Sequence, residues 1–225
     1  MLKGITFLNT AEDDTKRMKL IVFLTDGQAE SGRDFILKNI KNANSKGVAI
    51  FSLAFGNNAD YTFIKKLAVN NRGIARKIFE DSDASLQIKG FFDEISSSAL
   101  QNVTFKYLGN NEDILENATQ MNFNTFFNGK ELVIAGKLSE DDVKVVDLVV
   151  TGNGVDGHVE LTLESDIETN IPELTKEGDF TKITERIWAY LTIKQLLEQA
   201  IGENDDGEKK IMNDRALELS LKVFK

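Results

Sequence analysis

The sequence predicts a partial α/β fold that continues into an antiparallel β region and ends in a helical hairpin. Three observations predict this fold class. Residues 1–98 alternate apolar runs with segments of helical periodicity, which is typical of part of a doubly wound parallel sheet. Residues 99–172 alternate apolar and polar side chains between turn signals, as in a β-sandwich. Residues 173–225 carry two amphipathic helical patterns. We take these three ranges as the expected domains.

The first range predicts the order βαβαβα, and therefore parallel strands joined by right-handed crossovers. Both faces of the first strand are expected to be buried, because KLIVFL is a continuous apolar run. Asp60 is a suitable N-cap for the second helix, and Asp81–Asp83 open the third. The expected elements are a strand within Lys19–Gly27, a helix at Arg33–Lys46, a strand at Val48–Phe55, a helix at Tyr61–Asn70, a strand at Ala75–Phe79 and a helix reaching about Ser97.

The remaining ranges predict antiparallel strands and two helices. Glu131–Ala135 and Val143–Val150 are expected strands, and Val159, Leu161 and Leu163 alternate with polar residues in another. Gly152–Gly157 is glycine-rich, but it joins two strands and predicts a hairpin turn. The polar segment Gly202–Glu208 separates the two helices, which we expect to pack as a hairpin on the sandwich.

Composition excludes several classes of function. The net charge is −9, which disfavours a surface that holds nucleic acid or an anionic membrane. No apolar run is long enough to span a bilayer. Met1–Asn9 is too short and polar for a signal peptide, so the chain is expected to be cytoplasmic if it is complete as written. The chain lacks cysteine, which excludes disulfides and a Kunitz-type inhibitor framework.

Asp26 is the leading candidate for a functional side chain. It follows the first predicted strand, and ligands of open α/β sheets bind beyond the carboxyl ends of the strands. A carboxylate there suits Mg²⁺ or Ca²⁺, which take oxygen ligands. The alternative is a plain Asp-Gly turn. Glu30 and Ser31 are nearby oxygen donors, and Thr25 can supply a hydroxyl or a cap.

Other chemical signals have structural explanations. Asp83-Ala84-Ser85-Leu86-Gln87 superficially resembles the start of a metal-binding Asp-x-Ser-x-Ser loop, but it lacks the final serine. N-capping by Asp81, Ser82 or Asp83 explains it better. His158 is the single histidine and lies on the polar side of a predicted strand, which argues against a zinc site or a catalytic triad. An enzyme with Asp26 and Glu30 as paired carboxylates is the least supported reading, so we expect no catalytic residues and no enzyme activity.

Two tripeptides match the acceptor sequence for N-glycosylation. They are Asn102-Val103-Thr104 and Asn117-Ala118-Thr119. These sequons predict glycans at Asn102 and Asn117, but only in a secreted protein. The missing signal peptide argues against this prediction.

Several long segments together resemble a known family. KLIVFLTDG, VAIFSLAFG and DYTFIKKLAVNNRGIARKIFEDSDASLQIKGFFDEI resemble the second half of a von Willebrand factor A domain. The sequences of these segments resemble those of the inter-alpha-trypsin inhibitor heavy chains more closely still. ERIWAYLTIKQLLEQ and DRALELSLKVF resemble the segments of that family beyond the A domain. The resemblance covers the chain from about Lys19.

The resemblance implies a non-enzymatic, secreted carrier or matrix protein that becomes linked to hyaluronan and associates with a Kunitz-type inhibitor subunit. It also implies a metal-ion-dependent adhesion site, to which Asp26 would contribute. The Asp-x-Ser-x-Ser and threonine loops of that site are absent, so we expect this chain to bind no cation. The aspartate that forms the hyaluronan ester is expected beyond the end of this chain, and we interpret the chain as a partial product.

An open strand edge is the physical consequence of a partial sheet. Without the strand that would pair beside Leu20–Leu24, this apolar segment is expected to favour self-association. The main functional hypothesis is an extracellular binding protein of the heavy-chain family. The alternative is a cytoplasmic, A-domain-like interaction scaffold without a metal site.

Overall fold

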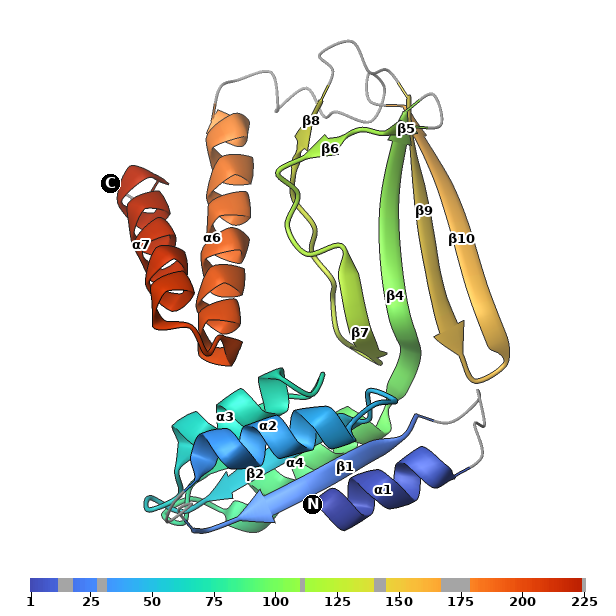
Figure 1. Ribbon diagram of the computed structural model, residues 1–225. Helices are drawn as coiled ribbons and strands as arrows, with labels where there is room; N and C mark the ends of the chain where they lie inside the picture. The colour runs from blue at the N-terminus through green and yellow to red at the C-terminus, as the bar shows by residue number, and fades with distance from the viewer. Residues whose placement is uncertain (12–17, 28–31, 110–111, 140–144, 167–178, 224–225) are drawn as a thin grey trace. The chain divides into compact units, whose positions relative to one another are not determined.

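Parallel strands and helices alternate through Met1–Ser97, the first of two units into which the chain divides (Figure 1). The computed structural model describes residues 1–11, 18–27, 32–109, 112–139, 145–166 and 179–223. In the first unit the elements are α1 (Leu2–Thr10), β1 (Leu20–Thr25), α2 (Arg33–Ala43), β2 (Ala49–Phe55), α3 (Tyr61–Val69), β3 (Ala75–Ile78) and α4 (Ala84–Ser96).

The strands of this unit form a three-stranded parallel sheet in the order β1-β2-β3. The central strand β2 is buried on both faces, as its apolar run predicts. The same prediction is wrong for β1, because Val22 and Leu24 are 45% and 53% exposed. A continuous apolar run shows that both faces can be buried, but an edge strand needs neighbours that cover them.

One face of the sheet packs against helices α1, α2 and α3. Ile5 of α1 is completely buried together with Ile40 of α2, Ile50 of β2 and Leu67 of α3. Helix α1 is not among the predicted elements, since its sequence offers no side-chain cap and was analysed only as a possible signal peptide. It nevertheless supplies a central residue of the core.

The opposite face of the sheet is covered by α4. Phe91 of α4 meets Phe51 of β2 edge-to-face, with ring centroids 6.4 Å apart. Arg76 of β3 lies over the Phe91 ring and donates to Glu94 of α4 at 2.6 Å. These contacts fix α4 on the β2 and β3 side, and Val22 and Leu24 of β1 stay exposed on that face.

The second unit, Ser98–Lys225, combines antiparallel strands with two long helices. A five-stranded sheet has the path β10-β9-β4-β5, with β7 also paired to β4, and β6 pairs with β8. The elements are β4 (Ser98–Gly109), β5 (Glu112–Asp113), β6 (Leu115–Glu116), β7 (Asn122–Phe127), β8 (Lys137–Leu138), β9 (Val145–Gly154), β10 (Gly157–Asp166), α6 (Asp179–Gly202) and α7 (Asp206–Val223).

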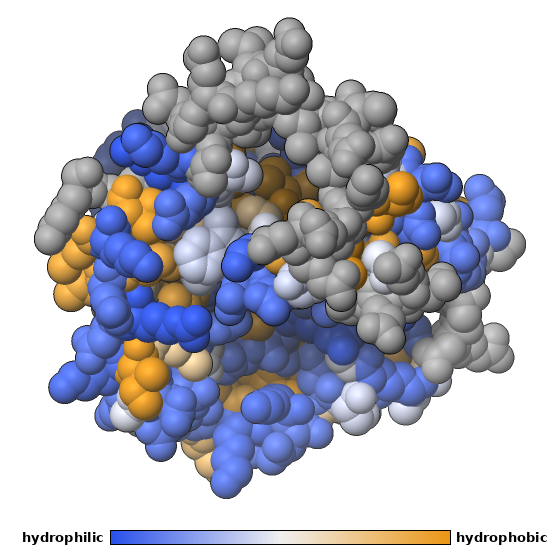
Figure 2. All heavy atoms as spheres, turned by 90° about the horizontal axis from the view of Figure 1, so that it is seen from above, coloured by the Kyte–Doolittle hydropathy of each residue, from blue (hydrophilic) through white to orange (hydrophobic). Residues whose placement is uncertain are grey.

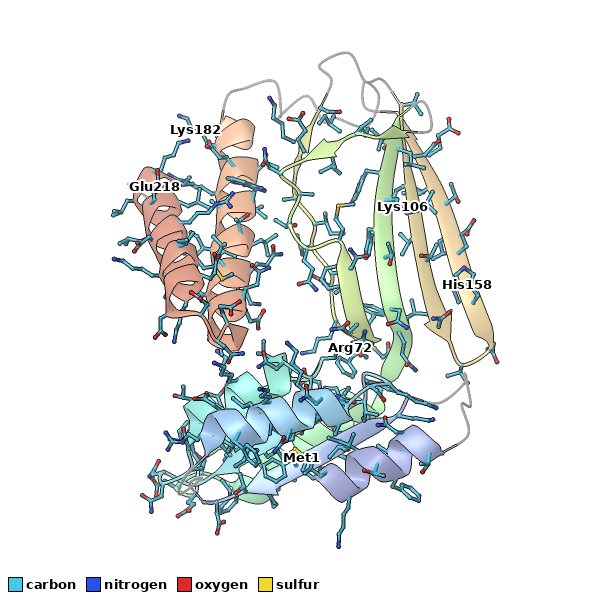
Figure 3. The ribbon with its side chains drawn as sticks, in the orientation of Figure 1. Met1, Arg72, Lys106, His158, Lys182 and Glu218 are labelled. Atoms are coloured by element: carbon cyan, nitrogen blue, oxygen red, sulfur yellow. The ribbon has the colours of Figure 1, made fainter. Side chains whose placement is uncertain are left out.

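The five-stranded sheet has one apolar and one polar face. Phe105 of β4 and Phe123 of β7 meet edge-to-face on the apolar side, with ring centroids 5.9 Å apart. On β10, Leu161 and Leu163 pair with Val150 and Leu148 of β9 on the same side. The polar side carries Lys106 and His158, both labelled in Figure 3. The predicted alternation therefore matches the register.

Two details of the predicted β region turned out differently. Glu131–Ala135 is not a strand, although Ala135 exchanges two hydrogen bonds with Thr119. The predicted strand from Val143 begins at Val145, with residues 143 and 144 outside the described residues. The hairpin at Gly152–Gly157 is confirmed, with Gly154 opposite Gly157 and φ of 119° at Gly157.

Helices α6 and α7 pack against each other as the predicted hairpin. The indole nitrogen of Trp188 in α6 donates to the carbonyl oxygen of Asn117 at 2.6 Å, which ties the hairpin to the β region. The fold class is thus confirmed: a parallel sheet with helices, then antiparallel β structure, then helices. The division of the second unit at residues 172 and 173 stays a prediction.

Candidate functional site

The carboxyl edge of the parallel sheet is the first candidate site. Strands β1, β2 and β3 run in the same direction and end at Thr25, Phe55 and Ile78, so the residues that follow them share one edge. Ligands of open α/β sheets bind at this edge, because loops and helix N-termini gather there. The candidate side chains at this edge are those that follow each strand.

Asp26 lies at this edge directly after β1, as the sequence predicts, and its side chain is exposed. The hydroxyl of Thr25 accepts a hydrogen bond from the backbone N–H of Gly27 at 3.3 Å, so Thr25 caps the turn. The other oxygen donors considered with Asp26, Glu30 and Ser31, lie outside the described residues.

Asp60 is a second carboxylate after a strand, and it already has two partners. One oxygen accepts from the backbone N–H of Phe63 at 3.1 Å, which confirms the predicted N-cap of α3. The other lies 2.7 Å from the Arg33 guanidinium, which comes from the start of α2. Arg33 thereby neutralises Asp60, so Asp60 is poorly suited as a ligand for a cation.

The described residues do not fit the divalent-cation site that the family resemblance implies. Mg²⁺ takes six oxygen ligands and Ca²⁺ six to eight, drawn largely from carboxylates. Within the described ranges, no group of three or more Asp, Glu, His or Cys side chains could hold an ion. Asp26 stands at the expected edge, and Asp60, which follows β2, forms an ion pair with Arg33.

The remaining chemical candidates have structural roles. Asp83 caps α4 by accepting from the N–H of Leu86 at 3.1 Å, and this bond, with one from Ser85, lowers the pKa of the Asp83 carboxyl. His158 is exposed on the polar face of the sheet, where its Nδ1 lies 3.5 Å from the Asn153 amide oxygen. These positions agree with the structural explanations of both residues.

Both sequon asparagines, Asn102 and Asn117, are exposed, and each has a φ of 49°. Asparagine tolerates this left-handed backbone better than most residues. Asn102 lies where the register between β4 and β9 shifts. The Thr119 side chain of the second sequon is buried, and its hydroxyl accepts from the N–H of Ala135 at 3.0 Å. Transfer of a glycan to Asn117 would therefore have to precede folding.

Sequence reasoning missed two long-range contacts, the Arg33–Asp60 ion pair and the hydrogen bond from Trp188 to Asn117. Arg33 and Asp60 lie far apart in the chain, so only the fold brings them together. The periodicity of Phe180–Ile201 places Trp188 beside an apolar stripe of the predicted helix, and the structure shows that its indole nitrogen donates to the β region. An indole in an otherwise apolar stripe is a weak signal for such a contact, because buried Trp N–H groups usually find an acceptor.

Comparison with known proteins identifies close relatives of the chain. Residues 2–94 match the family model of the von Willebrand factor type A domain. Inter-alpha-trypsin inhibitor heavy chain H3 of Bos taurus is 38% identical over 99% of this chain and 25% of its own length. Heavy chain H4 of Homo sapiens is 36% identical over 98% of this chain and 24% of its own length.

A solved structure supports the fold independently of sequence. The von Willebrand factor type A protein of Catenulispora acidiphila superposes with a TM-score of 0.50 at 12% identity, covering 99% of this chain and 59% of that one. No helix among the described residues is both long and apolar enough to cross a membrane. The chain spans about a quarter of the length of the heavy chains that it matches. Over nearly its whole length it is a homologue of the inter-alpha-trypsin inhibitor heavy chains, and residues 2–94 of its first unit match the von Willebrand factor type A domain.

Proposed function

We propose that this chain is a non-enzymatic, extracellular binding or carrier protein of the heavy-chain type. In this role it would be linked to hyaluronan and matrix and would associate with a Kunitz-type inhibitor subunit. The observation that carries the proposal is the similarity to heavy chains, which extends over 98–99% of the chain and therefore through both units. A shared domain alone would not reach the antiparallel sheet and the helical hairpin.

The surface of the first unit supports a role in protein association. The von Willebrand factor type A domain is a binding domain, and β1 lies at the edge of the described sheet. The outer edge of β1 pairs with no other strand among the described residues, and with the exposed side chains of Val22 and Leu24 it offers a surface on which another chain can add a strand. A second copy of this chain is one such partner, which gives the self-association that we propose for this edge.

The role that we propose for metal ions is correspondingly limited. Von Willebrand factor type A domains can bind a divalent ion, and Asp26 follows β1 at the edge where ligands of open α/β sheets bind. Asp60 forms an ion pair with Arg33, and no group of three or more Asp, Glu, His or Cys side chains among the described residues could hold an ion together with Asp26. We therefore propose that binding by residues 1–225 does not depend on Mg²⁺ or Ca²⁺.

Fractionation of the natural protein tests the proposed function. Extracellular fluid and matrix are separated from cytosol, hyaluronan is purified under denaturing conditions, and hyaluronidase releases whatever is covalently attached. Peptides such as those from α6 should appear in the released fraction and be absent from a mock digest. Recovery of these peptides from cytosol alone would contradict the proposal and favour the cytoplasmic scaffold.

A further inference from the structure

A large cavity lies within the second unit, between the apolar face of the five-stranded sheet and helix α6. Its volume is about 950 Å³, near the upper end of the range of about 300–1,000 Å³ that small-molecule sites occupy. The floor is formed by Tyr107, Leu148 and Leu163 of the sheet, and the helix contributes Ile187 and Trp188. This cavity is separate from the carboxyl edge of the parallel sheet, which belongs to the other unit.

Hydrogen bonds hold the third wall of the cavity, the segment from Val133 to Leu138. Thr119 donates its N–H to Ala135 at 2.8 Å and accepts the Ala135 N–H at 3.0 Å through its hydroxyl. Strand β8 then pairs with β6, and Trp188 bonds the Asn117 carbonyl at 2.6 Å. The wall and the helix are therefore both tied to the same short segment, so the cavity is a built feature of the unit.

The lining is apolar, and its charges cancel. Among the described side chains that line the cavity, Lys137 and Glu185 are the charged residues, one of each sign. Burial raises the pKa of the Tyr107 phenol, which therefore stays a neutral hydrogen-bond donor at physiological pH. Leu163 is 61% exposed although it lines the cavity, so its apolar surface faces an open hollow. Figure 2 shows apolar surface (orange) lying open among polar side chains (blue).

We propose that this cavity binds an uncharged, sterol-sized lipophile that carries a hydroxyl or carbonyl group. The apolar floor and Ile187 would contact the hydrocarbon body, and the Tyr107 phenol would bond the oxygen atom. A fatty acid fits less well, because Glu185 offsets the attraction of Lys137 for a carboxylate. The proposal is independent of the heavy-chain function and concerns only the second unit.

Trp188 makes the proposal directly measurable, because it is the single tryptophan of the chain and lines the cavity. Its emission overlaps the absorption of dehydroergosterol, a fluorescent sterol. Titration of the complete chain with this probe should quench Trp188 and sensitise the sterol emission, with a Kd in the micromolar range. Unlabelled cholesterol should reverse the signal. Cis-parinaric acid, a fluorescent fatty acid, should bind at least about tenfold more weakly.

Two leucines of β10 provide a matched pair of variants. Leu161 and Leu163 lie two residues apart on the same face, and both are 61% exposed, but only Leu163 lines the cavity. Leu163→Glu should weaken sterol binding at least about tenfold, because the carboxylate enters an apolar site. Leu161→Glu should change the Kd by less than about twofold, since exposed substitutions have small effects. Circular dichroism should show that both variants keep the fold.

Four results would overturn the proposal. Absence of energy transfer from Trp188, or equal weakening by both leucine variants, would show that the sterol does not occupy the cavity. Equal affinity for cis-parinaric acid would contradict the uncharged class of ligand. A dimer in sedimentation velocity that Leu163→Glu dissociates would show that a second copy covers the cavity instead.

Discussion

Ile5→Ala tests whether helix α1 is an integral part of the first unit. Ile5 is completely buried among Ile40, Ile50 and Leu67, so its truncation removes apolar contacts with α2, β2 and α3. Truncating a buried isoleucine to alanine costs about 2–5 kcal/mol, which includes the cavity that remains. Phe7→Ala is the matched control on the same helix, because Phe7 is 71% exposed, and it should cost less than about 0.5 kcal/mol.

Native-state hydrogen exchange of the β2 amides reads the stability of this unit without interference from the second unit. A loss of about 2 kcal/mol accelerates globally limited exchange by about 30-fold, because each 1.4 kcal/mol is a factor of about ten. Ile5→Ala should therefore accelerate β2 exchange at least that much, and Phe7→Ala should leave it nearly unchanged. If the two variants exchange alike, α1 does not pack in the core and the described arrangement is wrong.

Three further predictions concern the second unit, the cap of α4 and metal ions. Trp188→Phe removes the hydrogen bond to Asn117 and should cost about 0.5–1.5 kcal/mol in urea denaturation, whereas Tyr190→Phe on the exposed side of α6 should be neutral. Because the pKa of the Asp83 carboxyl is lowered in the folded chain, its cap stabilises α4 fully above the ordinary pKa of 3.8, and this stabilisation is lost as the pH falls through the lowered pKa. Asp83→Asn should therefore weaken the dependence of amide hydrogen exchange in α4 on acid pH. Addition of 1 mM (about physiological) Mg²⁺ or Ca²⁺ should leave the melting temperature unchanged, and a rise that Asp26→Asn abolishes would show a cation site.

Local patterns predicted most of the elements, because each depends on neighbours in the sequence. The three parallel strands, the caps at Asp60 and Asp83 and the glycine hairpin all follow from periodicity, capping and turn chemistry. Helix α1 lacks such signals, and its helical state depends on burying Ile5 against the sheet. Tertiary packing therefore decided the element that the sequence left unassigned.

Apolar patterns did not reveal which surfaces would be covered. The run in β1 predicted two buried faces, but Val22 and Leu24 remain exposed because no described element lies over them. Glu131–Ala135 has the composition of a strand, yet its backbone bonds Thr119 instead of joining a ladder. Burial and pairing both require a partner, and the partner lies far away in the sequence.

The candidate sites show the same limit. The position of Asp26 at a strand end follows from the sequence, since the carboxyl end of a parallel strand can be located from its apolar run. The neutralisation of Asp60 by Arg33 depends on how α2 and α3 begin side by side at that edge. The cavity combines residues from β4, β10 and α6, which no local pattern connects.

Mass spectrometry of the natural protein tests the central claim, a secreted binding protein of the heavy-chain type, most directly. Extracellular protein is treated with peptide N-glycosidase in H₂¹⁸O, which marks each formerly glycosylated asparagine. The account predicts peptides from both units in the extracellular fraction, with the mark at Asn102 or Asn117, whose side chains are exposed. Recovery of these peptides unmarked and only from cytosol would contradict it.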